Sequence, residues 1–235
     1  MRPMPRLLLT LLLSGCFAFS AHATDTLQPT IDKILNAHGG AEVWRNTSAI
    51  EYNADTFSQS RHALGTTQRS YQYPDKFRIS IAYPGGESEL RQLNNGQVWD
   101  HGKPGSAPFA KATQLQAMRM MPAKLLLEHR AVAKNLGTRK DDEGVTHQGI
   151  ELKMGDLKLI IDSDADSGFI LATWGVMEMM GQTMQFATFF HDYRVIEGRA
   201  IAFKEEHYAM GSYTGHTEIK EVKFPNSLPN ELFQP

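Results

Sequence analysis

The sequence predicts an α+β fold in which one strongly curved antiparallel sheet, an incomplete barrel, has helices covering an apolar cavity. Three observations predict this fold. About eleven segments alternate apolar and polar residues with the period of a strand, and turn signals separate them. Two other regions, one near the start and one in the middle, have helical periodicity. A sheet of this size curls or closes, so helices must cover its apolar inner face.

Residues 1–23 are interpreted as a signal peptide, because Arg2 and Arg6 precede the apolar run LLLTLLLSGCFAFSA. Two cleavage routes are open. The AHA ending at Ala23 is an A-x-A site, whereas LSGC resembles a bacterial lipobox in which Cys16 would be lipidated and the signal would end before it. We favour cleavage after Ala23. Both routes export the chain, so we expect a periplasmic protein, either free or tethered to a membrane through Cys16.

Residues 24–235 are expected to form one domain, since 235 − 23 leaves 212 residues and no linker or repeat divides them. Cys16 is the only cysteine, so a chain cut after Ala23 has no disulfide. The formal net charge of −2 becomes −4 when Arg2 and Arg6 are removed. A mildly acidic chain has no electrostatic reason to bind nucleic acid. We expect a monomer that needs no cofactor.

The first half of the domain begins with helices and continues as strands. Leu27, Ile31, Ile34 and Leu35 recur at helical spacing before Gly39-Gly40, and the short AEVWRN predicts a second helix. Pro-Asp, Pro-Gly-Gly and Asn-Gly turn signals then occur among five strands. The five strands are AIEYNADTFSQS, TTQRSYQY, KFRISIAY, ESELRQLN and QVWDHG.

The middle segment, residues 109–136, is helical, with an apolar stripe that includes Leu115 and Met118. Pro122 should kink it or divide it into two helices. We expect the part from Lys111 to about Leu127 to be a lid. Six further strands follow, with the sequences THQGIELKM, LKLIID, FILATWGVMEM, QTMQFATFFHDYRV, AIAFKEEHY and HTEIKEVKF.

Motifs for metal binding and catalysis are weak. The alternating aspartates of IDSDADSGF suggest calcium, but an EF-hand needs Gly at the sixth place and Glu at the twelfth, where Ser167 and Thr173 stand. We interpret the segment as a polar hairpin turn ending in Gly168. His191 has no partner at ligand spacing, and GSYTG is not a nucleophile elbow. We expect no metal site and no enzyme; a hydrolase built from residues distant in sequence remains an alternative.

The segment GVMEMMGQTMQFATFF is apolar on both faces of a hairpin, and the middle helix is also rich in methionine. An ordinary packed core would explain single residues. Taken together, the apolar residues of the hairpin and of the middle helix favour a cavity instead, in which methionine side chains repack around acyl chains. The candidate lining residues are Phe77, Ile79, Ile81, Trp99, Met118, Met121, Leu125, Trp174, Met177, Met180, Met184 and Phe186.

The ordered set of segments resembles the outer-membrane lipoprotein-sorting family, the LolA/LolB-like periplasmic carriers. It comprises ILNAHGGAEVWRNTSAI, YPDKFRISIAYPGG, NNGQVWDHG, LIIDSDADSGFIL, FHDYRVIEGRAIAFK and EVKFPNSLPNELFQP. The resemblance implies a non-catalytic carrier that binds a lipid or the acyl chains of a lipoprotein and exchanges it with an envelope donor or acceptor protein. A gating arginine is not singled out among Arg45, Arg69, Arg78 and Arg91. A sensor module that detects lipid or lipoprotein, and a purely structural envelope protein, are the alternatives.

The two cleavage routes predict different results when cells are labelled with a palmitate analogue. Cleavage after Ala23 removes Cys16, so we expect no label on the mature protein. Incorporation of the label would show instead that Cys16 is retained and lipidated.

Overall fold

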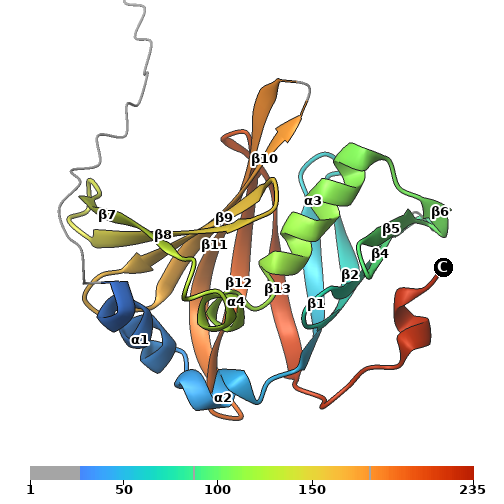
Figure 1. The fold of residues 1–235 in the computed structure, drawn as a ribbon. Coiled ribbons are helices and arrows are strands. Elements are labelled where there is room, and N and C mark those ends of the chain that lie inside the picture. Colours follow the sequence, from blue (N-terminus) through green and yellow to red (C-terminus); the bar gives the residue numbers. More distant parts are fainter. Residues whose placement is uncertain (1–26, 87, 180) are drawn as a thin grey trace, which may run out of the picture.

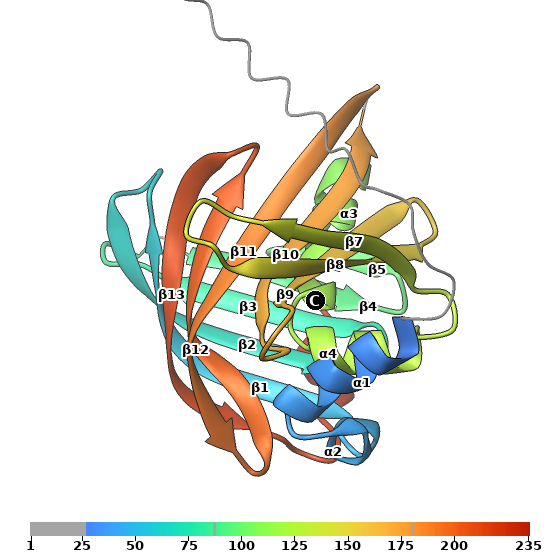
Figure 2. The same cartoon turned by 90° about the vertical axis from the view of Figure 1, so that its left-hand side faces the viewer.

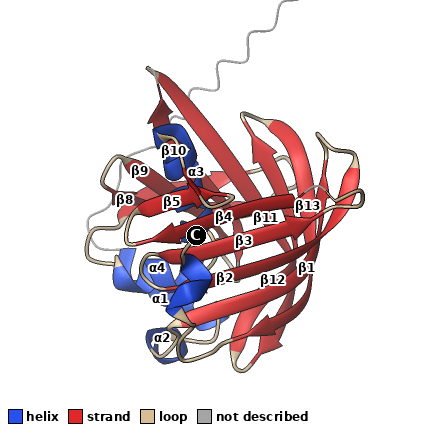
Figure 3. Ribbon diagram, turned by 90° about the vertical axis from the view of Figure 1, so that its right-hand side faces the viewer, coloured by secondary structure: helices blue, strands red, loops and turns tan. Residues whose placement is uncertain are grey.

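A computed structural model describes residues 27–86, 88–179 and 181–235 (Figure 1). The predicted signal peptide, with Cys16 and both cleavage sites, lies outside the described residues, as does Met180. Thirteen strands form one antiparallel sheet in the order β6-β5-β4-β3-β2-β1-β13-β12-β11-β10-β9-β8-β7. The sheet is strongly bent and not closed, which confirms the predicted curved, incomplete barrel (Figures 2 and 3).

The helices confirm the predicted division of the chain. Pro122 occupies the first turn of its helix, where a missing N–H costs nothing, so it divides the middle segment rather than kinking it. None of the described helices is long and apolar enough to cross a membrane. The helices are α1 (Leu27–Ala37), α2 (Ala41–Arg45), α3 (Ala107–Met118), α4 (Pro122–Glu128) and the 3₁₀ helix η1 (Asn230–Phe233).

The sheet contains all eleven predicted strands and two further strands. The two additions are β6 (Lys103–Pro104), which is very short, and β7 (Lys134–Lys140), which lies at the edge of the sheet. No residue of β7 is buried, so its sequence needs no alternation of apolar and polar residues. The others are β1 (Ala49–Ser58), β2 (Ala63–Gln72), β3 (Lys76–Ala82), β4 (Ser88–Asn94), β5 (Gln97–Asp100), β8 (Thr146–Met154), β9 (Leu157–Asp164), β10 (Ile170–Met179), β11 (Gln182–Ile196), β12 (Arg199–Ala209) and β13 (Ser212–Lys223).

The topology joins two meanders. Strands β1 to β6 form one arm and β7 to β13 the other, and the pairing of β1 with β13 unites them. Helices α3 and α4 connect the two free edges, β6 and β7. Helix α3 contacts β4 and β5 on one arm and β9 and β10 on the other, so it crosses the concave face (Figure 1). The α3 part of the predicted lid therefore lies between the arms, whereas its α4 part is buried against α1 and α2.

The core lies between the concave face and the helices. On β3, Phe77, Ile79 and Ile81 are buried, as their alternation predicts. Helices α1, α2 and α4 contact one another and gather at one end of the sheet (Figure 2). Leu126 of α4 and Trp44 of α2 are almost inaccessible to solvent there.

The segment IDSDADSGF forms the predicted polar turn. One carboxylate oxygen of Asp164 accepts hydrogen bonds from the N–H groups of Asp166 and Ser167, each at 2.8 Å. The carboxylate of Asp162 points elsewhere, 2.6 Å from Arg139 Nη2 and 3.0 Å from His147 Nδ1. Hydrogen bonds within the fold therefore explain Asp162 and Asp164.

Replacing Leu126 by Ala should lower the free energy of unfolding by about 2–5 kcal/mol, because it creates a cavity in a closely packed core. Leu64→Ala is the matched control, since Leu64 is 53 % exposed and its loss should change stability by less than about 0.5 kcal/mol. Denaturant unfolding of the two variants tests the packing, and equal losses of stability would contradict it.

Candidate functional site

The concave side of the sheet holds a cavity of about 340 Å³ that α3 borders. It extends to the surface beside Ser60 and Thr214, both of which are exposed. Its apolar wall includes Phe57, Ile79, Ile81, Tyr83, Ala112, Met120 and Phe186. Its charged or ionisable lining residues are Arg69, Glu89, Arg91, Arg119, Glu205 and His207. The cavity therefore joins an apolar wall to a polar one, and differs from the uniformly apolar hollow expected from the sequence.

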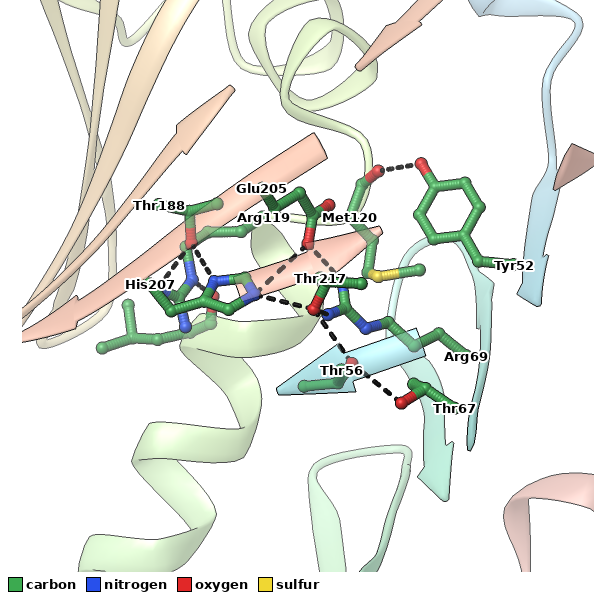
Figure 4. A network of polar contacts seen from close by, with 11 residues as sticks. Tyr52, Thr56, Thr67, Arg69, Arg119, Met120, Thr188, Glu205, His207 and Thr217 are labelled. Atoms are coloured by element: carbon green, nitrogen blue, oxygen red, sulfur yellow. Dashed lines mark hydrogen bonds and ion pairs between the residues drawn. The ribbon is translucent and has the colours of Figure 1, made fainter. Parts of the chain in front are cut away.

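An ion pair between Arg69 of β2 and Glu205 of β12 is the centre of the polar wall (Figure 4). Arg69 Nη1 lies 2.5 Å from Glu205 Oε2, and each side chain is only 8 % exposed. Arg69 Nη2 also donates a hydrogen bond to Thr217 Oγ1, at 2.7 Å. Since β1 and β13 separate β2 from β12, this pair bridges the middle of the sheet. Loss of one partner would leave a buried charge uncompensated.

A row of hydroxyl groups extends from this ion pair. Thr67 donates to Thr56 at 2.8 Å, Thr56 lies 3.0 Å from Thr217, and Thr217 lies 2.9 Å from His207 Nε2 (Figure 4). The strand register brings these groups together, because Thr217 is opposite Thr56 on one side and Glu205 on the other. Each buried hydroxyl group thereby obtains a hydrogen-bond partner.

Burial determines the charge states in this network. It lowers the pKa of His207 to about 3, against the attraction of Glu205 and with the help of the positive charges of Arg69 and Arg119. His207 is 24 % exposed, but this exposed part faces the cavity. Burial alone would raise the pKa of Glu205, yet Arg69, with a smaller contribution from Arg119, holds it below its usual value. At neutral pH Glu205 is therefore ionised and His207 is neutral.

The network does not have the geometry of a hydrolytic triad. A triad needs a carboxylate at one ring nitrogen of the histidine and the nucleophile at the other. Here Thr217 Oγ1 and Glu205 Oε2 both face Nε2 of His207, at 2.9 and 3.6 Å. The hydroxyl group at Nδ1 is that of Thr188, which lies 3.4 Å away, is buried and already accepts a hydrogen bond from Arg119. The distances of 3.4 and 3.6 Å exceed those between a nucleophile, its base and the orienting carboxylate. Thr217 is also fully buried. These contacts suit a structural network better than a nucleophile and its base.

Arg119 closes the polar wall from the helical side. It is the C-terminal capping residue of α3, and its Nη1 donates to Thr188 Oγ1 at 3.2 Å. Its Nε donates to the carbonyl oxygen of Leu115, also at 3.2 Å. Thr188 is opposite His207 in the strand register, so Arg119 joins the end of α3 to the network.

The predicted lining residues lie in several places. Ile79, Ile81 and Phe186 line the cavity. A second group is packed in the core: Phe77, Met118, Met121, Leu125 and Met177 are at most 8 % exposed. Met184 is half-buried against this core, and Trp99 is half-buried on β5. Part of the volume expected for a ligand is therefore filled by the protein itself.

Trp174 lies on the convex face instead. It borders an outer groove of about 380 Å³ together with Phe189 and Tyr208, and its ring meets that of Phe189 edge to face at 5.6 Å. The neighbouring Gly175 faces inward, where a Cβ would lie 3.3 Å from Leu115 of α3. Alternation along β10 then directs Trp174 outward.

None of the six charged or ionisable residues of the polar wall is among the predicted lining residues. Arg69 and Arg91 are two of the four possible gating arginines, and the other two, Arg45 and Arg78, do not line the cavity. Glu89, Arg119, Glu205 and His207 are not singled out in the sequence analysis. One sequence pattern could have identified two of these residues. Glu205 and His207 are two positions apart, so their ionisable side chains lie on the same face of β12.

Comparison with known proteins identifies the fold. No family model and no curated protein matches the sequence. A LolA superfamily protein from Nitrosomonas europaea superposes with a TM-score of 0.55 at 12 % identity, over 90 % of this chain and 99 % of that one. A domain from Vibrio parahaemolyticus described as an outer membrane lipoprotein-sorting protein domain has a TM-score of 0.51 at 10 % identity, over 88 % and 97 %. The chain has a LolA-like fold, as the sequence resemblance implied.

Lowering the pH below about 6.5 should destabilise the protein through His207. In the unfolded chain this histidine takes up a proton as the pH falls through about 6.5. In the folded protein, burial and the positive charges of Arg69, Arg119 and His216 keep His207 neutral down to about pH 3. Between these values the free energy of unfolding should fall by up to about 1.4 kcal/mol per pH unit from this group. His207→Gln should reduce that slope in urea titrations, while the exposed His191→Gln should reduce it less. Parallel slopes for wild type and His207→Gln would contradict the assignment.

Proposed function

We propose that the protein binds a lipid or an acylated segment in the concave cavity and carries it within the periplasm without covalent chemistry. The observation that carries the proposal is the cavity itself, which is open to solvent and has an apolar wall on β3, α3 and β11. Sites that bind small molecules occupy about 300–1,000 Å³ and are lined mainly by apolar groups around a few polar ones. A cavity of about 340 Å³ is at the lower end of that range.

The driving force is burial of hydrocarbon. Each methylene group transferred from water contributes about 0.8 kcal/mol before the costs of association. Ile79, Ile81 and Phe186 supply the apolar surface that a chain would contact. Release then requires an acceptor that competes for the same hydrocarbon, such as an envelope protein or a membrane.

Helix α3 is the element that admits the ligand. It spans the opening between the two arms, and its residues Ala112 and Gln116 line the cavity. It is joined to α4 through a short connection at Arg119–Met121. A shift of α3 away from β4 and β5 widens the cavity without breaking the sheet.

Two observations favour binding over catalysis. The arrangement of Glu205, His207 and Thr217 is unsuited to nucleophilic attack, for the reasons given above. The LolA-like fold is also that of a domain described as lipoprotein-sorting. Export from the cytoplasm agrees with this function but depends on the predicted signal peptide.

Filling the cavity should abolish binding. Ala112→Trp places a large side chain in the lining, and we expect it to weaken binding of a fluorescent fatty acid by at least about tenfold, or about 1.4 kcal/mol. Ala107→Trp adds the same side chain at an exposed position of the same helix and should bind like wild type. Circular dichroism of both variants checks that they fold.

Equal affinity of the two tryptophan variants would show that the fatty acid binds elsewhere. The outer groove beside Trp174 would then be the site to test.

A further inference from the structure

We propose that the ligand of the cavity is a single-chain amphiphile with an anionic head group, and that Arg119 binds this head. The inference rests on the proposed function, because it specifies which class of acyl compound the cavity accepts. It follows from the charges that line the cavity and from the place of Arg119 among them.

Arg119 is a cation without a carboxylate partner in the described part of the chain. Its two side-chain hydrogen bonds go to neutral acceptors, the hydroxyl group of Thr188 and the carbonyl oxygen of Leu115. A guanidinium has more N–H donors than these two bonds use. The remaining donors are available to a ligand in the cavity.

The other arginines of the lining are already paired. Arg69 binds Glu205, and Arg91 Nη2 lies 2.8 Å from Glu89 Oε2. The lining thus contains three arginines against two carboxylates, and His207 is neutral at pH 7. An excess of one positive charge remains, and it is the charge of Arg119.

The surroundings of Arg119 make this charge costly. Burial, together with the positive charges of Arg69 and Arg91, lowers its pKa to about 10, and only Glu205 acts in the other direction. Arg119 therefore stays protonated at neutral pH while having lost much of its hydration. A carboxylate or phosphate restores the lost interaction and can bind the planar guanidinium through two parallel hydrogen bonds.

The position of Arg119 determines the orientation of the ligand. A second, small void of about 30 Å³ lies on the other side of Arg119. Arg119 and Glu205 line both this void and the main cavity, so Arg119 lies at the inner end of the main cavity. The mouth is beside Ser60 and Thr214. A head held by Arg119 leaves the hydrocarbon against Ile79 and Ile81, pointing to the mouth. The cavity volume suits one chain rather than the several chains of a lipoprotein anchor.

Calorimetric titration of the mature protein with dodecanoate, dodecyl phosphate and dodecanol at neutral pH tests the inference. We expect the wild type to bind at least one of the anions about ten- to a hundredfold more tightly than dodecanol, the factor for one charged hydrogen-bonded contact. Arg119→Gln should remove the preference, so that neither anion binds more tightly than dodecanol does to the same variant. Arg119→Lys, which keeps the charge, should retain part of it.

Arg45→Gln is the control, because it removes an exposed arginine at the end of α2. It should keep the full preference for the anion. The stronger of the two anions identifies the head group as a carboxylate or a phosphate.

Two results would overturn the inference and leave the carrier function intact. One is equal binding of dodecanol and both anions to the wild type. The other is a preference for the anion that persists in Arg119→Gln. Failure of all three compounds to bind the wild type would instead contradict the proposed function.

Discussion

The curvature of a single open sheet is the constraint on which the rest of this structure depends. Because β1 pairs with β13, the two meanders share one continuous hydrogen-bonded surface, and its bend turns the apolar face of each arm toward the other. Helices must then fill the space between the arms. Of the helices in residues 27–235 that the structure describes, only α3 crosses this space, and α4 lies at one end of it. The core is therefore packed near α4 and remains hollow beside β3 and β11.

The ion pair between Arg69 and Glu205 spans the junction of the two meanders, and it gives the cavity a polar end. Burying two charges is expensive, and an apolar pair of similar size is often as stable. The threonines around the pair show how the cost is reduced, since each accepts or donates a hydrogen bond. We interpret the network as a means of keeping this part of the concave face from being filled with apolar side chains.

The sequence predicted the elements better than the site. Alternation identified β3 and its inward residues Phe77, Ile79 and Ile81, and Pro122 correctly separated α3 from α4. Strand β7 was missed because an exposed edge strand needs no alternation. Trp174 was expected inside, but its face depends on the packing of α3 against Gly175, which no local pattern reveals.

The polar wall was missed for a different reason. Arg69 and Glu205 are 136 positions apart and meet only through the pairing of β1 with β13. In sequence, each of them resembles a residue on the wet face of a strand. The methionines of the hairpin that begins at Gly175 were interpreted as lining, yet Met177 is buried in the core. Composition indicated an apolar interior, but only the fold shows which part of it is empty.

The most direct test is mass spectrometry of the organic extract from protein purified out of cells that export it. The account predicts one acyl compound per protein molecule, recovered from the wild type and absent from the variant with a filled cavity. Repeated recovery of an empty protein, which also ignores added fatty acid, would contradict it.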